Sequence, residues 1–195
     1  MTKNIGVDAA KLAGLQIDQN HKLRNGQMTI EHLEWFNNLT KYQRDLFLKQ
    51  WANTFYPNEF FQTRKGLWVS SDFKKYILSV ARHTKEKTKT ISSLFIDLEK
   101  PMTNTEIRAK LPENHVFDTD EFCLYLADKI RKQQRGEKGE FLSNRKGNLH
   151  FVYGKDLVVF VVSVGWCVDA RQWLVNAYEL DDYQWDAGYR AFSCN

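Results

Sequence analysis

The hydrophobic pattern of this chain changes from a helical to a strand period near residue 140, and this change constrains the fold more than any other feature. Beyond it, four apolar runs are separated by short turns: LHFVYG (149–154), LVVFVVSVGW (157–166), QWLVNAYEL (172–180) and GYRAFSC (188–194). They predict an antiparallel meander of three or four strands at the end of the chain. Because helical patterns dominate before residue 140, the sequence predicts an α+β fold, with an N-terminal helical half followed by a C-terminal antiparallel β-meander.

Two helix starts with the same pattern are the strongest local signals in the middle of the chain. Thr103 and Glu106 fit one capping box, Asp118 and Glu121 fit a second, and apolar residues flank each box as a hydrophobic staple. Gly136 fits the C′ position that ends the second of these helices. Together with an amphipathic segment before them, the predicted helices span 89–99, 104–111 and 119–135.

The first part of the chain carries weaker signals. Residues 1–28 are interpreted as a loosely ordered arm and 29–86 as a helical region, followed by helices and sheet over 87–195 that form one compact unit with 29–86. Within the helical region, the pattern predicts a helix capped by Thr29, a Thr40–Gln43 capping box, a short strand in GLWVS (66–70), and a helix capped by Ser71 with Phe73, Ile77, Val80 and Ala81 on one side.

Positive charge is concentrated in the segment 129–146. The whole chain has a net charge of +4, this segment alone has +5, and residues 147–195 have −3. Three helices followed by a basic hairpin match a winged-helix outline, in which basic side chains neutralise phosphates and release counterions. The candidate nucleic-acid-binding residues are Lys129, Arg131, Lys132, Arg135, Lys138, Arg145 and Lys146. The alternative is a solvated helix end whose cations complement the helix dipole.

The start of the third predicted helix argues against base reading. A winged-helix protein presents the N-terminal part of that helix to base edges, whereas here this part carries Asp118, Asp120 and Glu121. Phosphate contact without sequence preference therefore fits the pattern better.

Three tryptophans, Trp166, Trp173 and Trp185, lie within twenty residues of one another in the predicted sheet. Packing in a core or on a sheet face explains them, and a partner-binding patch is the alternative, since tryptophan is enriched at binding hot spots.

Several site classes have no pattern in the sequence. Cys123, Cys167 and Cys194 are scattered, with no Cys-x-x-Cys, and the five histidines lack ligand spacing, so neither a metal site nor a disulfide framework is expected. Nucleotide-binding loops and nucleophile elbows are absent, and we expect no cofactor. No apolar run reaches the length of a membrane span and the first residues lack a signal-peptide pattern, which favours a cytoplasmic protein without membrane association.

Two resemblances accompany these patterns. GQMTIEHLEWFNNLTKYQRDLFL and WLVNAYELDDYQWDAGYRAFS together resemble small uncharacterised bacterial proteins of mobile-element or reduced-genome type, with a helical start and a tryptophan-rich terminal sheet; this resemblance implies no activity. GNLHFVYGKDLVVFVVSVG is similar to the strand–turn–strand of small ribosome-dependent ribonuclease toxins. That likeness implies basic and aromatic residues on the sheet, for which Arg171, Tyr189 and Arg190 are candidates.

The leading hypothesis from the sequence is a non-enzymatic intracellular binding protein, encoded by a phage or mobile element, that engages nucleic acid or a nucleoprotein complex through the basic segment. One alternative is a protein–protein adaptor or inhibitor, directed at a host protein, that uses the tryptophan-rich sheet. Another is a small ribonuclease toxin. Nucleic-acid binding should weaken steeply with salt, adaptor binding through apolar surface should not, and a nuclease should leave cleaved RNA.

Overall fold

The computed structural model describes residues 29–40, 43, 54–85, 93–181 and 183–194. Contacts divide the chain into two units, Met1–Asn53 and Thr54–Asn195, and each is described by itself. The predicted arm over 1–28 lies outside the described residues. Buried residues between Phe55 and Leu78 pack into the same core as the helix and sheet that follow.

In the first unit, helix α2 (Ile30–Asn38) begins at the predicted cap. The Thr29 hydroxyl accepts a hydrogen bond from the His32 backbone N–H at 3.4 Å. The Thr40–Gln43 box is also present: the Thr40 N–H donates to Gln43 Oε1 at 2.9 Å, and the Gln43 N–H donates to Thr40 Oγ1 at 3.2 Å. The helix predicted after this box extends beyond the described residues.

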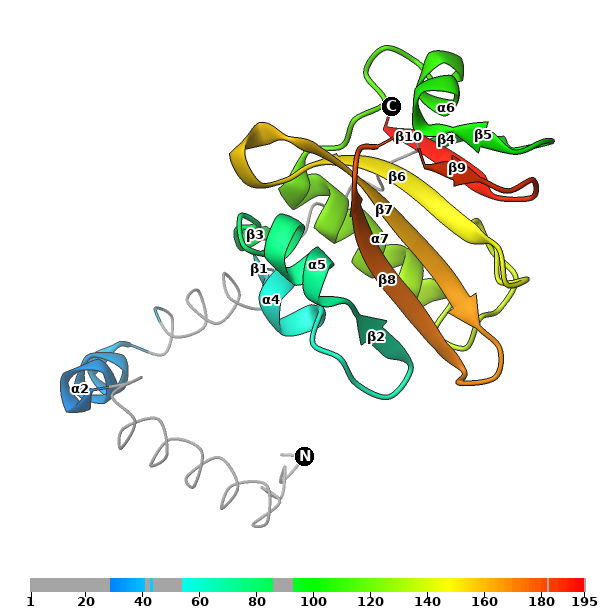
Figure 1. The fold of residues 1–195 in the computed structure, drawn as a ribbon. Helices are drawn as coiled ribbons and strands as arrows, with labels where there is room; N and C mark the ends of the chain where they lie inside the picture. Colours follow the sequence, from blue (N-terminus) through cyan, green and yellow to red (C-terminus); the bar gives the residue numbers. More distant parts are fainter. Residues whose placement is uncertain (1–28, 41–42, 44–53, 86–92, 182, 195) are drawn as a thin grey trace. The chain divides into compact units, whose positions relative to one another are not determined.

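The second unit contains short helices, one long helix and a mixed sheet (Figure 1). Its helices are α4 (Pro57–Phe60), α5 (Ser71–Phe73), a π-helical turn (Lys74–Leu78), α6 (Asn104–Lys110), α7 (Thr119–Lys132) and a 3-10 turn (Lys155–Leu157). Its strands are β1 (Thr54–Phe55), β2 (Leu67–Val69), β3 (Thr84–Lys85), β4 (Ser93–Asp97), β5 (Met102–Thr103), β6 (Gly147–Tyr153), β7 (Val159–Cys167), β8 (Gln172–Glu179), β9 (Gln184–Trp185) and β10 (Arg190–Cys194).

Six strands form the main sheet in the order β2-β8-β7-β6-β10-β4. Strands β6, β7 and β8 are antiparallel neighbours, as the sequence predicts. The last strand is present where predicted, but it does not extend the meander. After β8 the chain pairs β9 with β5 and then returns on the far side of β6, so that β10 is parallel to β6 and antiparallel to β4. The fold is therefore α+β with a mixed sheet whose two edge strands come from the first half of the chain.

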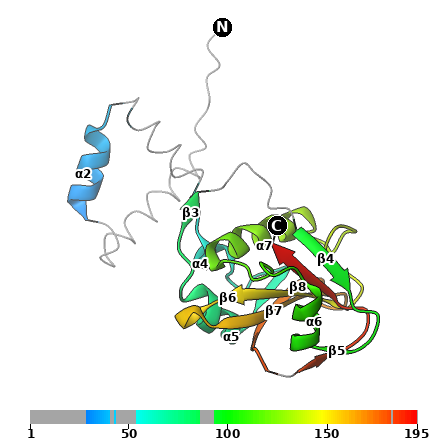
Figure 2. The ribbon, with the colours of Figure 1, turned by 90° about the horizontal axis from the view of Figure 1, so that it is seen from above.

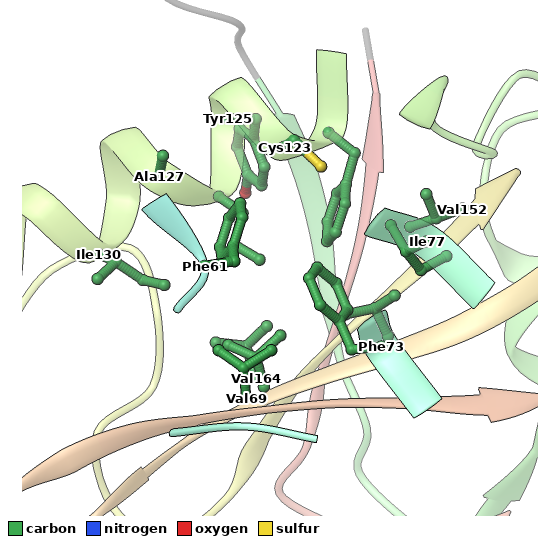
Figure 3. Close-up of a cluster of buried hydrophobic side chains, with 14 of the residues drawn as sticks. Phe61, Val69, Phe73, Ile77, Cys123, Tyr125, Ala127, Ile130, Val152 and Val164 are labelled. Carbon is green, nitrogen blue, oxygen red and sulfur yellow. The ribbon is translucent and has the colours of Figure 1, made fainter. Parts of the chain in front are cut away.

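The two faces of the sheet pack against different layers. Figure 2 shows α7 and α6 on opposite sides of the sheet. The larger core lies between α7, α5, α4 and one sheet face, and Figure 3 shows Tyr125 and Ile130 of α7 in the same cluster as Phe61, Phe73 and Val164. A smaller core lies on the other face, where α6, β5 and β9 cover β6 and β10.

Both helix starts predicted from capping boxes are confirmed. The capping box of Thr103 and Glu106 is complete, and α6 begins at Asn104. The Asp118 carboxylate accepts hydrogen bonds from the backbone N–H groups of Asp120 and Glu121, and α7 begins at Thr119. Such caps stabilise a helix start by about 0.5–2 kcal/mol because they satisfy donors that have no partner within the helix.

The end of α7 differs from the prediction. The helix stops at Lys132, not at residue 135, and Gln133 is its C-cap. The Gln133 side chain donates to the carbonyls of Glu137 and Phe141 and accepts from the Phe141 N–H, so it binds the loop that follows. Gly136 thus lies within a turn at a φ of +70°, and a Cβ there would meet the Trp166 indole at 2.3 Å.

The helix predicted over 89–99 is wrong for the described part of that range. Residues Ser93–Asp97 form strand β4, with Phe95 opposite Phe192 and Asp97 opposite Arg190 on β10. The spacing of Leu94, Phe95 and Leu98 suits a helix, but pairing with a strand about a hundred residues later determines the structure. The first helix of the winged-helix outline is therefore absent from residues 93–97.

The helix predicted from Ser71 is present with shifted limits. The Ser70 hydroxyl, not that of Ser71, accepts from the Phe73 N–H at 3.1 Å, so the helix starts one residue earlier than predicted. Phe73 and Ile77 are buried as expected, but the π-helical turn ends at Leu78 and Val80 lies beyond it, exposed.

His150, one of the five histidines that lack ligand spacing, is buried completely in the larger core. Its ring stacks on Phe192 at 4.9 Å, and neither ring nitrogen has a hydrogen-bond partner among the described residues. Burial lowers the pKa of His150 to about 3; backbone groups of Val162 and Asn148 oppose this shift, and the charge of Lys129 adds to it. The imidazole is therefore neutral at ordinary pH.

This burial predicts a specific loss of stability in acid. Since the pKa of His150 is lower in the folded than in the unfolded chain, the unfolded chain binds the proton first as the pH falls from about 6.5 towards about 3. We expect the stability of the wild type relative to His150→Leu to fall by about 2 kcal/mol between pH ~7 and pH ~5. Urea unfolding at both pH values measures this, and a difference that does not change with pH would contradict the assignment.

Candidate nucleic-acid interface

Lys129, the first residue of the predicted basic segment, is buried in the protein. Its side chain is buried in α7, its Nζ lies 2.5 Å from Glu140 Oε2, and the same nitrogen is 5.1 Å from the centre of the Tyr125 ring. A buried amine paired in this way holds the loop after α7 against the helix. Lys129 is therefore removed from the set of phosphate-binding candidates.

The other six candidates remain at the surface, although several already have acidic or aromatic partners. Lys132 pairs with Asp128 at 2.8 Å, Arg145 pairs with Asp169 at 3.3 Å, and Lys146 lies 5.5 Å from the centre of the Tyr189 ring. Arg131, Arg135 and Lys138 are exposed. Lys132 and Arg145 are thus paired with carboxylates, and Arg131 and Arg135 lie at or just after the end of α7.

Two cations that the sequence analysis did not select lie beside this group. Arg64 and Lys65 occupy the turn before β2, and β2 pairs in parallel with β8, where Leu67 lies opposite Trp173. Trp173 connects the two segments: its N–H donates to the Gly66 carbonyl at 3.0 Å, and its indole N–H donates to the Gln133 carbonyl at 2.7 Å. One buried tryptophan therefore holds the 64–66 turn next to the C-terminal end of α7.

Phe60, Arg64 and Arg131 line two adjoining hollows, which we call the basic groove. The Arg64 guanidinium lies 4.8 Å from the centre of the Phe60 ring, and that of Arg131 lies 5.1 Å from the same centre. The larger hollow, about 430 Å³, is also lined by Thr54, Phe55, Tyr56, Glu59 and Gln62. The smaller one, about 230 Å³, is also lined by Lys65, Gly66, Leu67, Ile130 and Gln134.

Arg64 is held in place before any ligand arrives. Its Nη1 donates to the carbonyls of Phe60 and Gln62, the latter at 3.3 Å, while its guanidinium lies over the Phe60 ring. A long cationic side chain ordinarily loses rotamer freedom worth about 2 kcal/mol when it is immobilised. Because Arg64 is already anchored, much of this cost does not arise on binding.

Acidic side chains reduce the positive charge of the groove without cancelling it. Glu59 lines the larger hollow, and Glu137 lies next to Arg135. The pKa of Glu137 is below its usual value, mainly because the Arg135 backbone N–H donates to its carboxylate. Glu137 is therefore ionised at neutral pH, and the groove relies on Arg64, Lys65 and Arg131 for its positive charge.

The tryptophan patch considered in the sequence analysis is not a surface. Trp166, Trp173 and Trp185 are all buried, with exposed fractions of 8%, 0% and 5%. Trp166 and Trp173 pack edge to face in the larger core, and Trp185 donates from its indole N–H to Asn104 Oδ1 at 2.8 Å in the smaller one. Their rings are thus not available to a partner.

Other aromatic residues reach the surface instead. Tyr178, Tyr183 and Tyr189 surround Trp185 with ring centres 5.6, 4.8 and 5.5 Å from it, and we call these three residues the tyrosine face. Tyr178 and Tyr183 are exposed. Partial burial raises the pKa of Tyr178 and of Tyr189, and the neighbouring Tyr183 adds to both shifts.

The residues suggested by the ribonuclease likeness are not brought together on one side. Tyr189 packs against the smaller core, whereas Arg190 pairs with Asp97 at 2.7 Å and lies over the Phe95 ring beside the larger core. Arg171 lies in the turn between β7 and β8. The sheet therefore does not present these three side chains as one cluster.

Among residues 29–40, 43, 54–85, 93–181 and 183–194, no group of three His, Cys, Asp or Glu side chains is placed to hold a metal ion. The three cysteines are free, and burial raises the pKa of the Cys123 thiol, which disfavours the reactive thiolate. None of the helices in the described part of the chain is both long and apolar enough to cross a bilayer.

Comparisons with protein-family models, curated proteins and solved structures found no match.

Proposed function

We propose that this protein is a non-enzymatic binding protein that engages nucleic acid, alone or in a nucleoprotein complex, through the basic groove. The observation that carries the proposal is the pair of guanidinium groups on Phe60, from two segments far apart in the sequence, between two hollows. Arginines fixed on aromatic rings can contact phosphates and unpaired bases. Lys65 lines the smaller hollow, and the exposed Arg135 and Lys138 follow the end of α7.

The winged-helix mode of docking is not part of this proposal. Residues 93–97 form β4, and the first turn of α7 is acidic, with Asp120 paired to Arg82 at 3.2 Å. Nucleic acid would be repelled by that end of α7 and attracted by the other. We therefore infer phosphate contact with little sequence preference, and selectivity would have to come from a partner protein.

The proposal extends to the setting of the protein. We infer a cytoplasmic location, in keeping with three free cysteines, which are typical of reducing compartments. An inhibitor encoded by a phage or mobile element and directed at a host nucleoprotein complex would fit a compact basic binder of this kind.

The salt dependence of binding tests this function. If four to six phosphates are contacted, the logarithm of the association constant should fall with the logarithm of salt concentration at a slope of about −3 to −5. Fluorescence anisotropy with labelled oligonucleotides over a range of salt concentrations measures it. Absence of binding to DNA and RNA even at low salt would contradict the proposal.

A second candidate is favoured by the tyrosine face. Exposed tyrosines around a buried tryptophan are typical of protein-binding surfaces, so the protein could act as an adaptor or inhibitor through this face. Binding by that route would change little with salt and would be lost on substitution of Tyr178 and Tyr183, with the basic groove left intact.

A further inference from the structure

We propose that the basic groove is built for single-stranded nucleic acid, in preference to a duplex; this inference rests on the proposed function. The groove combines hollows, aromatic rings and cations in one place, whereas contact with duplex phosphates requires only an accessible positive surface.

The larger hollow has room for a base. Its volume of about 430 Å³ falls in the range of about 300–1,000 Å³ that is usual for sites of small organic ligands. It is lined by the rings of Phe55, Tyr56 and Phe60 beside Arg64 and Arg131. In a duplex the bases are stacked and paired inside the helix, and flipping one out costs a few kcal/mol, so a single strand supplies a base to this hollow without that cost.

The cations are arranged for stacking as well as for charge. Arg131 lies 5.7 Å from the centre of the Phe55 ring in addition to its contact with Phe60, and Arg64 is fixed on the other segment by two carbonyls. A guanidinium held over an aromatic ring offers a planar surface on which a base can stack, together with N–H groups for a phosphate. A lysine-only surface would offer the charge alone.

Two adjoining hollows allow a strand to continue past the stacked cations. Both are lined by Phe60, Arg64 and Arg131, and Lys65 and Gln134 line only the smaller one. A strand could thus place a base in the larger hollow, pass its backbone over the guanidinium groups and continue towards Lys65. Because every base has a flat face, this arrangement predicts tolerance of sequence and works for DNA and RNA alike.

The chain provides a matched control for the aromatic contact. Phe95, on the edge strand β4, is also in contact with an arginine: the Arg190 guanidinium lies 3.8 Å from the centre of its ring. That arginine is neutralised by Asp97, and β4 lies at the opposite edge of the sheet from β2. Phe60→Leu and Phe95→Leu therefore remove the same ring from the same kind of contact, once inside the groove and once far from it.

The test uses the full chain and labelled oligo-dT, oligo-U and duplex DNA of about 12 residues, with anisotropy at about 50 mM salt. We expect both single strands to bind at least about ten-fold more tightly than the duplex. Phe60→Leu should weaken single-strand binding by roughly five- to a hundred-fold and leave duplex binding unchanged, while Phe95→Leu should change neither. Circular dichroism confirms that both variants are folded.

The outcomes separate this inference from the proposed function. Equal affinity for duplex and single strands, or a single-strand preference that Phe60→Leu does not reduce, would overturn the inference while nucleic-acid binding itself stood. Failure of all three oligonucleotides to bind would overturn the proposed function and this inference with it. If only oligo-dT or only oligo-U shows the preference and the loss in Phe60→Leu, the inference holds for that nucleic acid.

Discussion

Replacing Arg64, Lys65, Arg135 and Lys138 by Glu together should reduce nucleic-acid binding by about a hundred-fold or more. Each change removes a cation that could neutralise a phosphate and puts a repelling charge in its place. All four side chains are exposed, so the fold should be kept, with a modest loss of stability from the Arg64 contacts to Phe60 and Gln62. Anisotropy at low salt measures the loss, and circular dichroism with thermal unfolding checks the fold.

Net charge alone also affects binding, so the variant needs a control with the same change in charge. Lys74, Lys100, Lys110 and Lys155 are exposed and do not line the groove. Their replacement by Glu lowers the net charge by the same amount and should reduce the affinity far less. If both quadruple variants lose binding equally, the interaction depends on overall charge and the groove has no special role.

Deletion of residues 186–195 should prevent the second unit from folding. The deletion removes β10, which lies between β6 and the edge strand β4. Phe192, completely buried against His150 and Phe141, would be lost from the larger core, and β6 would become an unpaired edge. We expect insoluble protein on expression, because unpaired strand edges and exposed core surface promote aggregation.

A milder variant distinguishes the loss of the strand from the loss of chain length. Phe192→Ala keeps β10 and removes one buried ring, at an expected cost of about 3–5 kcal/mol in stability. The variant should remain soluble and still fold, with a lowered midpoint of unfolding. A soluble truncated protein with cooperative unfolding would show that β10 is dispensable, and the described order of strands would then be incorrect.

The parts of the fold that depend on neighbouring residues could be predicted from the sequence. The caps at Thr103 and Asp118 fix the starts of α6 and α7, because a side chain and the N–H groups it binds lie within three residues. The antiparallel neighbours β6, β7 and β8 follow from alternating apolar residues and short turns. Local hydrogen bonding and short connections are sufficient for these elements.

Elements that depend on distant partners could not be predicted in the same way. The segment of Leu94 and Phe95 has helical spacing, and only pairing with β10 makes it a strand. Likewise, GYRAFSC reads as the next strand of a meander, but the pairing of Trp185 with Met102 in β9 and β5 leads the chain to the other side of β6. In both cases the partner strand lies about eighty residues or more away in the sequence, so local patterns do not reveal the pairing.

The candidate site was predicted only in part for the same reason. Arg131 is a candidate because of the charge of its own segment, but its neighbours Arg64 and Phe60 lie in the predicted helical region 29–86, where no site residue is predicted. Lys129 was selected by charge as well, although it is buried with Glu140, because the charge of a segment does not reveal which side of the helix each lysine occupies. Lys129 falls on the same side of α7 as the buried Phe122, Leu126 and Ile130, and this helical spacing was the signal that could have revealed its burial.

Photo-crosslinking of the wild-type protein to a single strand that carries a photoreactive base identifies directly the residues that contact nucleic acid. If the basic groove binds the strand, we expect adducts in peptides that contain Tyr56 and Phe60 or the end of α7 around Arg131, and we expect these adducts to be lost when Arg64, Lys65, Arg135 and Lys138 are replaced by Glu. Adducts confined to Tyr178, Tyr183 or Tyr189 would place the nucleic acid on the tyrosine face and would contradict the assignment of the basic groove.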